Sequence, residues 1–186
     1  MDNIKYYNQN ADTYFELSLK KDMTDCCNLF LDELPDKPRI LDVGCGSGRD
    51  MRYFSQKGCV VNGIDASKEL VKLATNYTGL SVKCLRIQEL IENNIYNGVW
   101  CCASLLHIPK QEMPSVYNRL WRSLKNKGIC FVSYKSEIIN KNDERLFTCY
   151  DQESLKKFIN NSTNFLIKKI WTSKSEDNWI NALLLK

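Results

Sequence analysis

The sequence predicts an α/β protein built on a doubly wound, mostly parallel sheet with an antiparallel last strand and helices on both faces. Three observations lead to this fold class. Apolar strand-like runs alternate with amphipathic stretches of helical period, which is typical of parallel strands joined by crossover helices. A turn with three glycines follows the first run, and the last two apolar runs have no helix between them. Runs joined by a short turn are expected to pair antiparallel.

The predicted strands are short runs rich in β-branched, aromatic or small apolar residues. They cover Arg39–Val43, Cys59–Ile64, Val82–Leu85, Gly98–Ala103 and Gly128–Tyr134, and then Phe165–Thr172 and Trp179–Leu185. The expected helices are Arg49–Lys57, one capped by Ser67 that reaches Tyr77, one near Met113–Leu124 with Pro114 in its first turn, and a short one capped by Asp151. This order predicts three layers.

The segment ILDVGCGSGRD, residues 40–50, predicts a ligand-binding turn between the first strand and its helix. Gly44, Gly46 and Gly48 can each take a positive φ, and none carries a Cβ that would keep a ligand from the backbone. Asp42 stands at the carboxyl end of the strand, where open α/β sheets bind their ligands. A carboxylate there favours a ligand that carries a positive group.

The glycine spacing argues against a dinucleotide. A dinucleotide-binding turn has the pattern G-x-G-x-x-G, but the place of its third glycine is taken by Arg49. Asp42 would also repel a pyrophosphate. Asp65 ends the next apolar run, where a carboxylate suits two hydrogen bonds from a ribose. A cationic ligand with a ribose and no phosphate fits both carboxylates.

At this point the chain resembles the class I S-adenosylmethionine-dependent methyltransferases, on the motif LDVGCGSG and the acid Asp65, over roughly residues 39–134. The resemblance implies a Rossmann-like sheet of seven strands with a reversed last strand, and S-adenosyl-L-methionine as the cofactor. The implied cofactor-binding residues in this region are Asp42, Gly44, Cys45, Gly46 and Gly48 for the methionine end, Asp65 for the ribose, and Ala66 beside it.

The same resemblance assigns roles after the third and fourth strands. Ile87 is placed against the adenine ring, and Gln88 near its amino group, although Gln88 reads equally as a solvated turn residue. Many family members carry an acid where this chain has Arg86. Ser104 lies in the segment that passes beneath the methionine portion of the cofactor toward the substrate.

His107 is the only histidine and follows the fourth strand. Its ordinary pKa of ~6.5 would suit a general base that deprotonates the attacking nucleophile. The alternative is a residue that merely closes the loop before Pro109, because methyl transfer from a sulfonium can proceed by proximity and alignment alone. Lys135 and Arg145 are the other candidate substrate ligands, which would grip a carboxylate or another oxyanion.

The first 34 residues are expected to form a helical lid, in front of a core that spans residues 35–186. In the enzymes that the chain resembles, this region folds over the cofactor. Tyr14 is the candidate that would face the sulfonium, through a cation–π contact of ~0.5 to 2 kcal/mol. Tyr6 and Tyr7 either join it or pack the first helix onto the sheet.

Length and composition predict a single domain over residues 1–186, in the cytoplasm, and the resemblance implies that it is a methyltransferase domain. No run approaches 18 apolar residues, and the start lacks the pattern of an export signal. The formal charge of +4 is spread along the chain, so nucleic acid is not indicated as a partner. The chain has nine cysteines without a C-x-x-C pair and a single histidine, which predicts no metal site. Five of the cysteines lie in apolar runs or in the glycine turn and are expected to be small buried hydrophobes: Cys45, Cys59, Cys101, Cys102 and Cys130.

The sequence therefore predicts in-line methyl transfer to a small-molecule acceptor. Two alternatives stay open: methylation of a tRNA or another macromolecule, and a cofactor-binding protein without transferase activity. The chain lacks the N/D-P-P-Y/F signature after its fourth strand, where CASLLH stands instead, which argues against the amino-nitrogen methylases of DNA and of protein glutamine.

Overall fold

The computed structural model describes residues 3–138, 143, 145–175 and 177–186, and its centre is a seven-stranded sheet in the order β3-β2-β1-β4-β5-β7-β6. The strands are β1 (Arg39–Val43), β2 (Val60–Asp65), β3 (Val82–Cys84), β4 (Tyr96–Cys101), β5 (Leu124–Lys135), β6 (Leu166–Lys174) and β7 (Asn178–Leu185). The first five are parallel, and β7 runs antiparallel to β5 and β6, which confirms the predicted fold.

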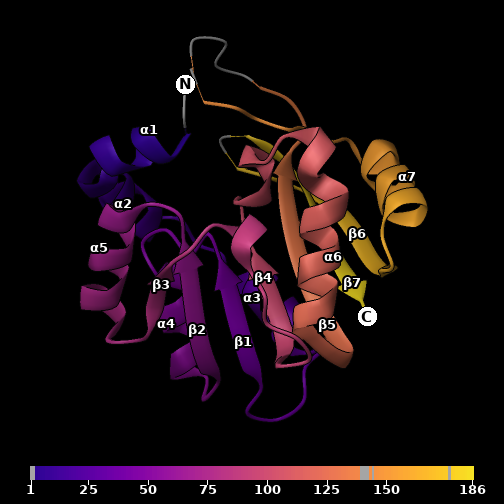
Figure 1. Cartoon of the computed structure of the whole chain (residues 1–186), viewed down its shortest axis with the longest axis horizontal. Coiled ribbons are helices and arrows are strands. Elements are labelled where there is room, and N and C mark those ends of the chain that lie inside the picture. The colour runs from indigo at the N-terminus through magenta and orange to yellow at the C-terminus, as the bar shows by residue number, and fades with distance from the viewer. Residues whose placement is uncertain (1–2, 139–142, 144, 176) are drawn as a thin grey trace.

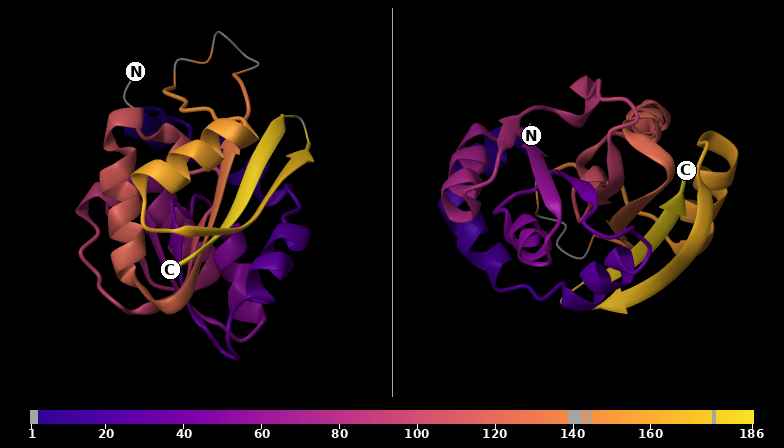
Figure 2. Two further views of the ribbon diagram at one scale, coloured as in Figure 1. Left: turned by 90° about the vertical axis from the view of Figure 1, so that its right-hand side faces the viewer. Right: turned by 90° about the horizontal axis from the view of Figure 1, so that it is seen from below.

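Helices cover both faces of the sheet. The helices α6 (Met113–Ser123) and α7 (Gln152–Ser162) pack on one face, whereas α3 (Thr24–Leu31) and α4 (Arg49–Gln56) pack on the other. Figure 1 shows α6 in front of the sheet with α3 and α4 behind it, and the view from below in Figure 2 shows the strands between these two layers. The three predicted layers are present.

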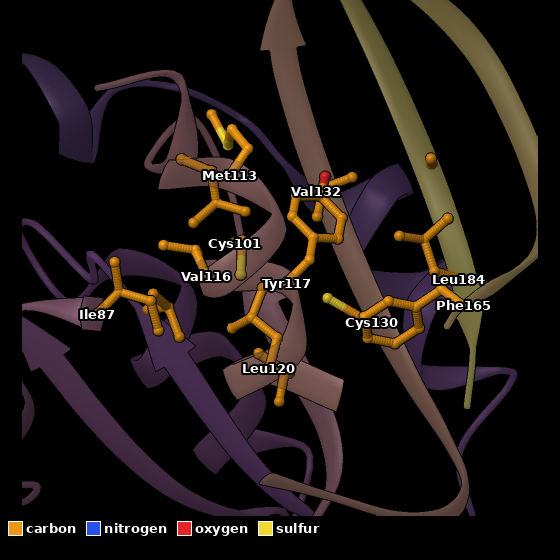
Figure 3. Close-up of a cluster of buried hydrophobic side chains, with 14 of the residues drawn as sticks. Ile87, Cys101, Met113, Val116, Tyr117, Leu120, Cys130, Val132, Phe165 and Leu184 are labelled. Carbon is orange, nitrogen blue, oxygen red and sulfur yellow. The ribbon is translucent and has the colours of Figure 1, made fainter. Parts of the chain in front are cut away.

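The face under α6 is filled by side chains that the helical period places inward. Val116, Tyr117 and Leu120 are fully buried. Figure 3 shows them directed toward Cys101 of β4 and Cys130 of β5. Both cysteines behave as the small buried hydrophobes that the sequence predicts, and all nine cysteines of the chain are free.

The opposite face is built around Trp100. Its ring stacks on Phe131 with centroids 3.9 Å apart, and packs against Phe30 of α3 at 5.1 Å. The indole N–H donates to Asp50 at 2.9 Å, so this large side chain is buried without an unsatisfied polar atom. Phe30 belongs to the predicted lid segment, yet it is fully buried in this core.

The helices α1 (Asn3–Gln9) and α2 (Ala11–Leu19) lie against α5 (Lys68–Thr78), on the side where the parallel strands end. Phe15 meets Tyr77 edge to face at 5.6 Å, and Ser67 donates to Asn8 at 2.8 Å. Of the expected lid, α1 and α2 therefore lie over the carboxyl edge of the sheet, while α3 is part of the core.

The segment after β5 returns to the same edge. Thr148 donates its amide to the carbonyl of Leu106 at 2.6 Å and its hydroxyl to that of Ile108 at 2.7 Å. These bonds bring Arg145 and Leu146 beside the loop that follows β4. Leu146 contacts His107 of that loop, although the two residues are 39 positions apart in the sequence. Within the described residues, no helix is long and apolar enough to cross a membrane.

Candidate active site

A cavity of about 290 Å³ opens at the carboxyl ends of β1, β2 and β4, beneath α1 and α2. The structure brings most of the predicted site residues to its wall. Those that line it are Tyr14, Gly44, Gly46, Asp65, Ala66, Ile87, Gln88, Ser104 and His107. Five predicted residues are not among its lining residues: Asp42, Cys45, Gly48, Lys135 and Arg145.

The glycine turn has the backbone that the sequence predicts, since φ is +67°, +55° and +78° at Gly44, Gly46 and Gly48. At each of the three glycines, a neighbouring side chain also leaves little room for a Cβ atom. A Cβ on Gly46 would come 3.1 Å from the ring of Tyr14, and one on Gly48 would come 2.6 Å from Thr78 on α5. Gly48 therefore allows the close packing of α5, and its expected contact with the cofactor stays a prediction.

Asp65 ties the second strand to this turn. Its carboxylate accepts hydrogen bonds from the amides of Gly46 at 2.9 Å and Ser67 at 2.8 Å. Burial raises the pKa of Asp65 above its ordinary value, and these backbone donors offset part of that rise. Each carboxylate oxygen keeps acceptor capacity, so the group can still bind hydroxyls in the cavity.

Asp42 lies deeper than the sequence suggests and is 3% exposed. Burial and the nearby carboxylate of Asp50 hold its pKa well above the usual range. Arg49 does not balance it directly, because its guanidinium binds both oxygens of Asp50, at 2.6 and 2.8 Å, and the carbonyl of Ser18. A contact between Asp42 and a positive ligand group stays a prediction.

The cavity wall beside β3 carries the residues expected to meet an adenine. Ile87 is buried with 7% of its surface exposed, and Gln88 donates its amide N–H to Glu112 at 2.8 Å. A carboxylate can only accept, so this bond fixes which end of the Gln88 amide faces Glu112. The carbonyl oxygen of Gln88 is then available to accept from a ligand.

The end of β4 is strained at the cavity. Ala103 has φ of +49°, a value that residues with a Cβ seldom adopt, and its amide donates to Ser133 at 2.8 Å. The next side chain, Ser104, has a buried hydroxyl without a hydrogen-bond partner in the described part of the chain. A buried, unsatisfied hydroxyl on a cavity wall is a place for a polar ligand atom.

His107 is held between two segments that are distant in sequence. Its Nδ1 lies 2.9 Å from the carbonyl oxygen of Leu146, and its Nε2 lies 2.7 Å from the hydroxyl of Tyr7 on α1. Burial, aided by the charge of Arg145, lowers the pKa of His107 to about 4, so the ring is neutral near pH 7. The structure places His107 at the cavity with no free nitrogen, unlike the general base considered from the sequence.

The two predicted cationic ligands are paired within the protein. Lys135 lies 2.7 Å from Asp177, and Arg145 donates to Asp143 through Nε at 2.9 Å. Arg145 also donates to the hydroxyl of Tyr7 at 3.0 Å. The geometry therefore does not support binding of a substrate oxyanion by Lys135 or Arg145, because carboxylates of the protein already compensate their charges.

Several cavity residues were not singled out from the sequence. Asn3 and Ile4 reach the cavity from α1, Leu146 from the segment after β5, and Glu112 from the turn before α6. Asn3, Tyr7 and Tyr14 are spaced by four and seven residues, which would place them on one face of a helix. This spacing is a weak sequence signal that they line one surface. For Leu146 and Glu112 no local pattern exists.

The wall can position ligands but offers little covalent chemistry. Its described lining residues include no cysteine and no lysine, and no group of three described histidine, cysteine or acidic residues could hold a metal ion. What it does offer is two carboxylates, the backbone of two glycines, an orphan hydroxyl and aromatic rings. This set suits the non-covalent binding of a polar ligand.

Comparison with known proteins agrees with this architecture. Residues 40–128 match a family model described as a methyltransferase domain. YqeM of Bacillus subtilis, provisionally named a methyltransferase, is 34% identical over 103 residues, which are 52% of this chain and 42% of that protein. A ubiquinone biosynthesis O-methyltransferase of Rickettsia canadensis is 31% identical over 102 residues, again 52% of this chain and 42% of its own. The matched parts cover less than half the length of these curated relatives.

Among solved structures, the chain resembles the 1,6-didemethyltoxoflavin-N1-methyltransferase of Burkholderia thailandensis, which was crystallised with 1,6-didemethyltoxoflavin and S-adenosylhomocysteine. The TM-score is 0.84 at 16% identity, and the match covers 98% of this chain and 86% of the other. At this identity the likeness establishes the fold.

Proposed function

The chain belongs to the class I methyltransferases by its methyltransferase domain and seven-stranded sheet, and from this premise we propose that it transfers a methyl group from S-adenosylmethionine to a small molecule. The observation that carries the proposal is the join between Asp65 and the glycine turn. A carboxylate and a turn that excludes Cβ atoms meet at one wall of a single cavity.

The residues present fit this cofactor. Asp65 would accept hydrogen bonds from the ribose hydroxyls, and Ala66 and Ile87 would enclose the adenine, with the Gln88 oxygen toward its amino group. The orphan hydroxyl of Ser104 and the turn at Gly44 and Gly46 would hold the methionine portion. The half-buried ring of Tyr14 lies against Gly46, where it would face the sulfonium. When bound, the cofactor supplies an activated methyl group.

Catalysis would then come chiefly from positioning. The sulfonium is already a good leaving group, so alignment of the acceptor with the methyl carbon supplies most of what the protein needs to add. No described lining residue is a free strong base, since His107 uses both ring nitrogens in hydrogen bonds.

A small acceptor is favoured over a macromolecule. The cavity of about 290 Å³ has the scale of a small-ligand site, and the two cationic side chains expected to bind a substrate oxyanion, Lys135 and Arg145, are paired with carboxylates. The named activities of the Rickettsia and Burkholderia relatives, on a ubiquinone precursor pathway and on 1,6-didemethyltoxoflavin, support the same class.

The first test is calorimetry with S-adenosylmethionine, S-adenosylhomocysteine and NAD. Micromolar binding of the first two and none of NAD is expected, and preferential binding of NAD would reject the assignment.

The second test uses cofactor labelled in its methyl group, incubated separately with a small-metabolite extract and with tRNA. Label is expected in the metabolite fraction. Label in tRNA, with transfer that falls steeply as salt rises, would reject the small-molecule class. Cofactor binding without label in either fraction would instead favour a protein that only binds the cofactor.

A further inference from the structure

The hydrogen bonds around His107 determine where its proton lies. A backbone carbonyl can only accept, so the Nδ1 atom that faces Leu146 at 2.9 Å must carry a proton. The ring is neutral, because burial and the neighbouring charges of Arg145 and Lys135 lower the pKa of His107 by more than the hydrogen bond to Leu146 and the charge of Asp143 raise it. Its Nε2 atom is therefore unprotonated and accepts a hydrogen bond from the Tyr7 hydroxyl at 2.7 Å.

These contacts fix the hydrogen-bonding role, or polarity, of the Tyr7 hydroxyl toward the cavity. Its single proton is committed to His107, and its oxygen accepts a hydrogen bond from Nη1 of Arg145 at 3.0 Å. A phenol oxygen has one remaining site for acceptance, and Tyr7 lines the cavity. Toward a ligand this hydroxyl can accept a hydrogen bond but cannot donate one.

The same end of the cavity has little to stabilise an anion. Arg145 lies 4.6 and 5.0 Å from the ring centroids of Tyr6 and Phe147 and is neutralised by Asp143. The other lining residues around Tyr7 and His107 are mostly apolar: Ile4, Leu105, Ile108, Pro109 and Leu146. Burying an unpaired anion against such a wall is costly.

We propose that Tyr7 positions the methyl acceptor, that His107 is a positioning residue which fixes the polarity of Tyr7, and that the acceptor is a neutral molecule with a hydroxyl or ring N–H as its nucleophile. This inference rests on the proposed function and names the substrate class of that site. The O–H or N–H of the acceptor would donate to Tyr7, which directs the nucleophilic lone pair of the same atom toward the methyl group.

The proton has a path that balances the reaction. As the acceptor atom bonds to the methyl carbon, the bond from that carbon to sulfur breaks and its electron pair stays on sulfur. The methylated acceptor atom, now positively charged, passes its proton to the Tyr7 oxygen while the Tyr7 proton moves to Nε2 of His107. An imidazole with a pKa of about 4 is basic enough for so strong an acid, and it then releases the proton to water.

The single histidine allows a direct test of this polarity. In protein labelled with ¹⁵N at histidine, two-bond ¹H–¹⁵N spectra report the tautomer and titration of His107 alone. We expect the proton on Nδ1, and a titration midpoint well below that of free histidine. Tyr7→Phe should shift the Nε2 signal and raise the midpoint, while Tyr53→Phe, which removes a surface hydroxyl bonded to Asn28, should change neither.

A proton on Nε2 in the wild type, or identical titration in wild type and Tyr7→Phe, would overturn the proposed polarity. This measurement needs neither cofactor nor acceptor, so it remains decisive even if the proposed function fails.

The charge class of the acceptor is tested by transfer from labelled cofactor to a metabolite extract separated by ion exchange into anionic, cationic and neutral fractions. Label is expected from the neutral fraction, and Tyr7→Phe should lower kcat by roughly tenfold or more with S-adenosylhomocysteine affinity changed less than about threefold. An acceptor from the anionic fraction, or unchanged kcat in Tyr7→Phe, would overturn the inference alone. Failure of the wild type to bind S-adenosylhomocysteine would instead overturn the proposed function.

Discussion

At the end of the cavity proposed to hold the ribose, a carboxylate is held by backbone amides, whereas the proposed acceptor end is held by side chains that are far apart in sequence. Asp65 binds the amides of Ser67 and Gly46, which are 2 and 19 residues away. Tyr7 binds His107 and Arg145, which are 100 and 138 residues away. The first end forms with the β1–β2 unit, and the second forms only when α1 and the segment after β5 both dock on the sheet.

This difference suits the two ends of the cavity to two different ligands. Backbone contacts within one supersecondary unit give a rigid site for a ligand of constant shape, which the cofactor is. Side-chain contacts between a terminal helix and a loop change readily by substitution and open at lower free energy cost. We expect changes at the first end to act on cofactor affinity, and changes at the second to act on the acceptor and on pH dependence.

The largest effect is expected from Gly46→Val. A side chain at φ of +55°, with its Cβ 3.1 Å from Tyr14, strains the turn and pushes the ring into the cavity. Calorimetry should show S-adenosylhomocysteine affinity lowered by more than about a hundredfold. Gly79→Val is the matched control, because φ is +68° there with no atom within 4 Å of the added Cβ. Wild-type affinity in a folded Gly46→Val variant would remove the turn from the site.

Asp65→Ala should have the next largest effect. Hydrogen bonds to a charged group are worth roughly 1.5 to 3 kcal/mol, so affinity for S-adenosylhomocysteine should fall by about tenfold to a hundredfold. Wild-type affinity should also fall in acid as Asp65 gains a proton, and at a higher pH than for a free aspartate, because burial raises its pKa. The exposed Asp36→Ala serves as control, and an Asp65→Ala variant that binds normally would place the ribose elsewhere.

The acceptor end should make stability depend on pH. The pKa of His107 is about 4 in the folded protein against ~6.5 when unfolded, so the unfolded chain binds more protons between these values. Its contribution to stability is therefore present above about pH 6.5, and is lost as pH falls toward 4. Denaturant unfolding at pH 7 and pH 4.5 should show a loss in the wild type that is smaller in His107→Gln, by on the order of 2 kcal/mol. Equal losses in both proteins would contradict the burial assigned to His107.

The smallest effect is expected at Glu112, which orients the Gln88 amide through an exposed bond of 2.8 Å. Once Glu112 is replaced by alanine, the amide can turn and donate to a ligand. Preference for S-adenosylhomocysteine over its 6-oxo analogue, S-inosylhomocysteine, should fall by a few-fold, as a hydrogen bond of about 1 kcal/mol allows. A preference unchanged in both Glu112→Ala and Gln88→Ala would show that backbone groups alone read the purine edge.

Much of the fold followed from patterns within a few residues. Ser67 caps α5 by accepting from the amide of Leu70, and Asp151 caps α7 by accepting from that of Ser154, as their positions before apolar periods predict. The parallel strands and the reversed β7 were predictable because alternation and turn length act locally. The same holds for the positive φ of the glycine turn and for the placement of Asp65 at a strand end.

The sequence by itself determined the element order, the ligand turn and the carboxylate beside it, because helix period, strand period and turn chemistry are short-range properties. Only the tertiary structure decided that α3 belongs to the core, that Gly48 packs against α5, that Arg145 pairs with Asp143, and that the Tyr7 hydroxyl meets Nε2 of His107. For three of these the partners lie far apart along the chain, and for Arg145 local spacing does not say whether the guanidinium meets Asp143 or a ligand. Charge pairing and the position of a proton depend on which groups folding brings within about 3 Å of each other.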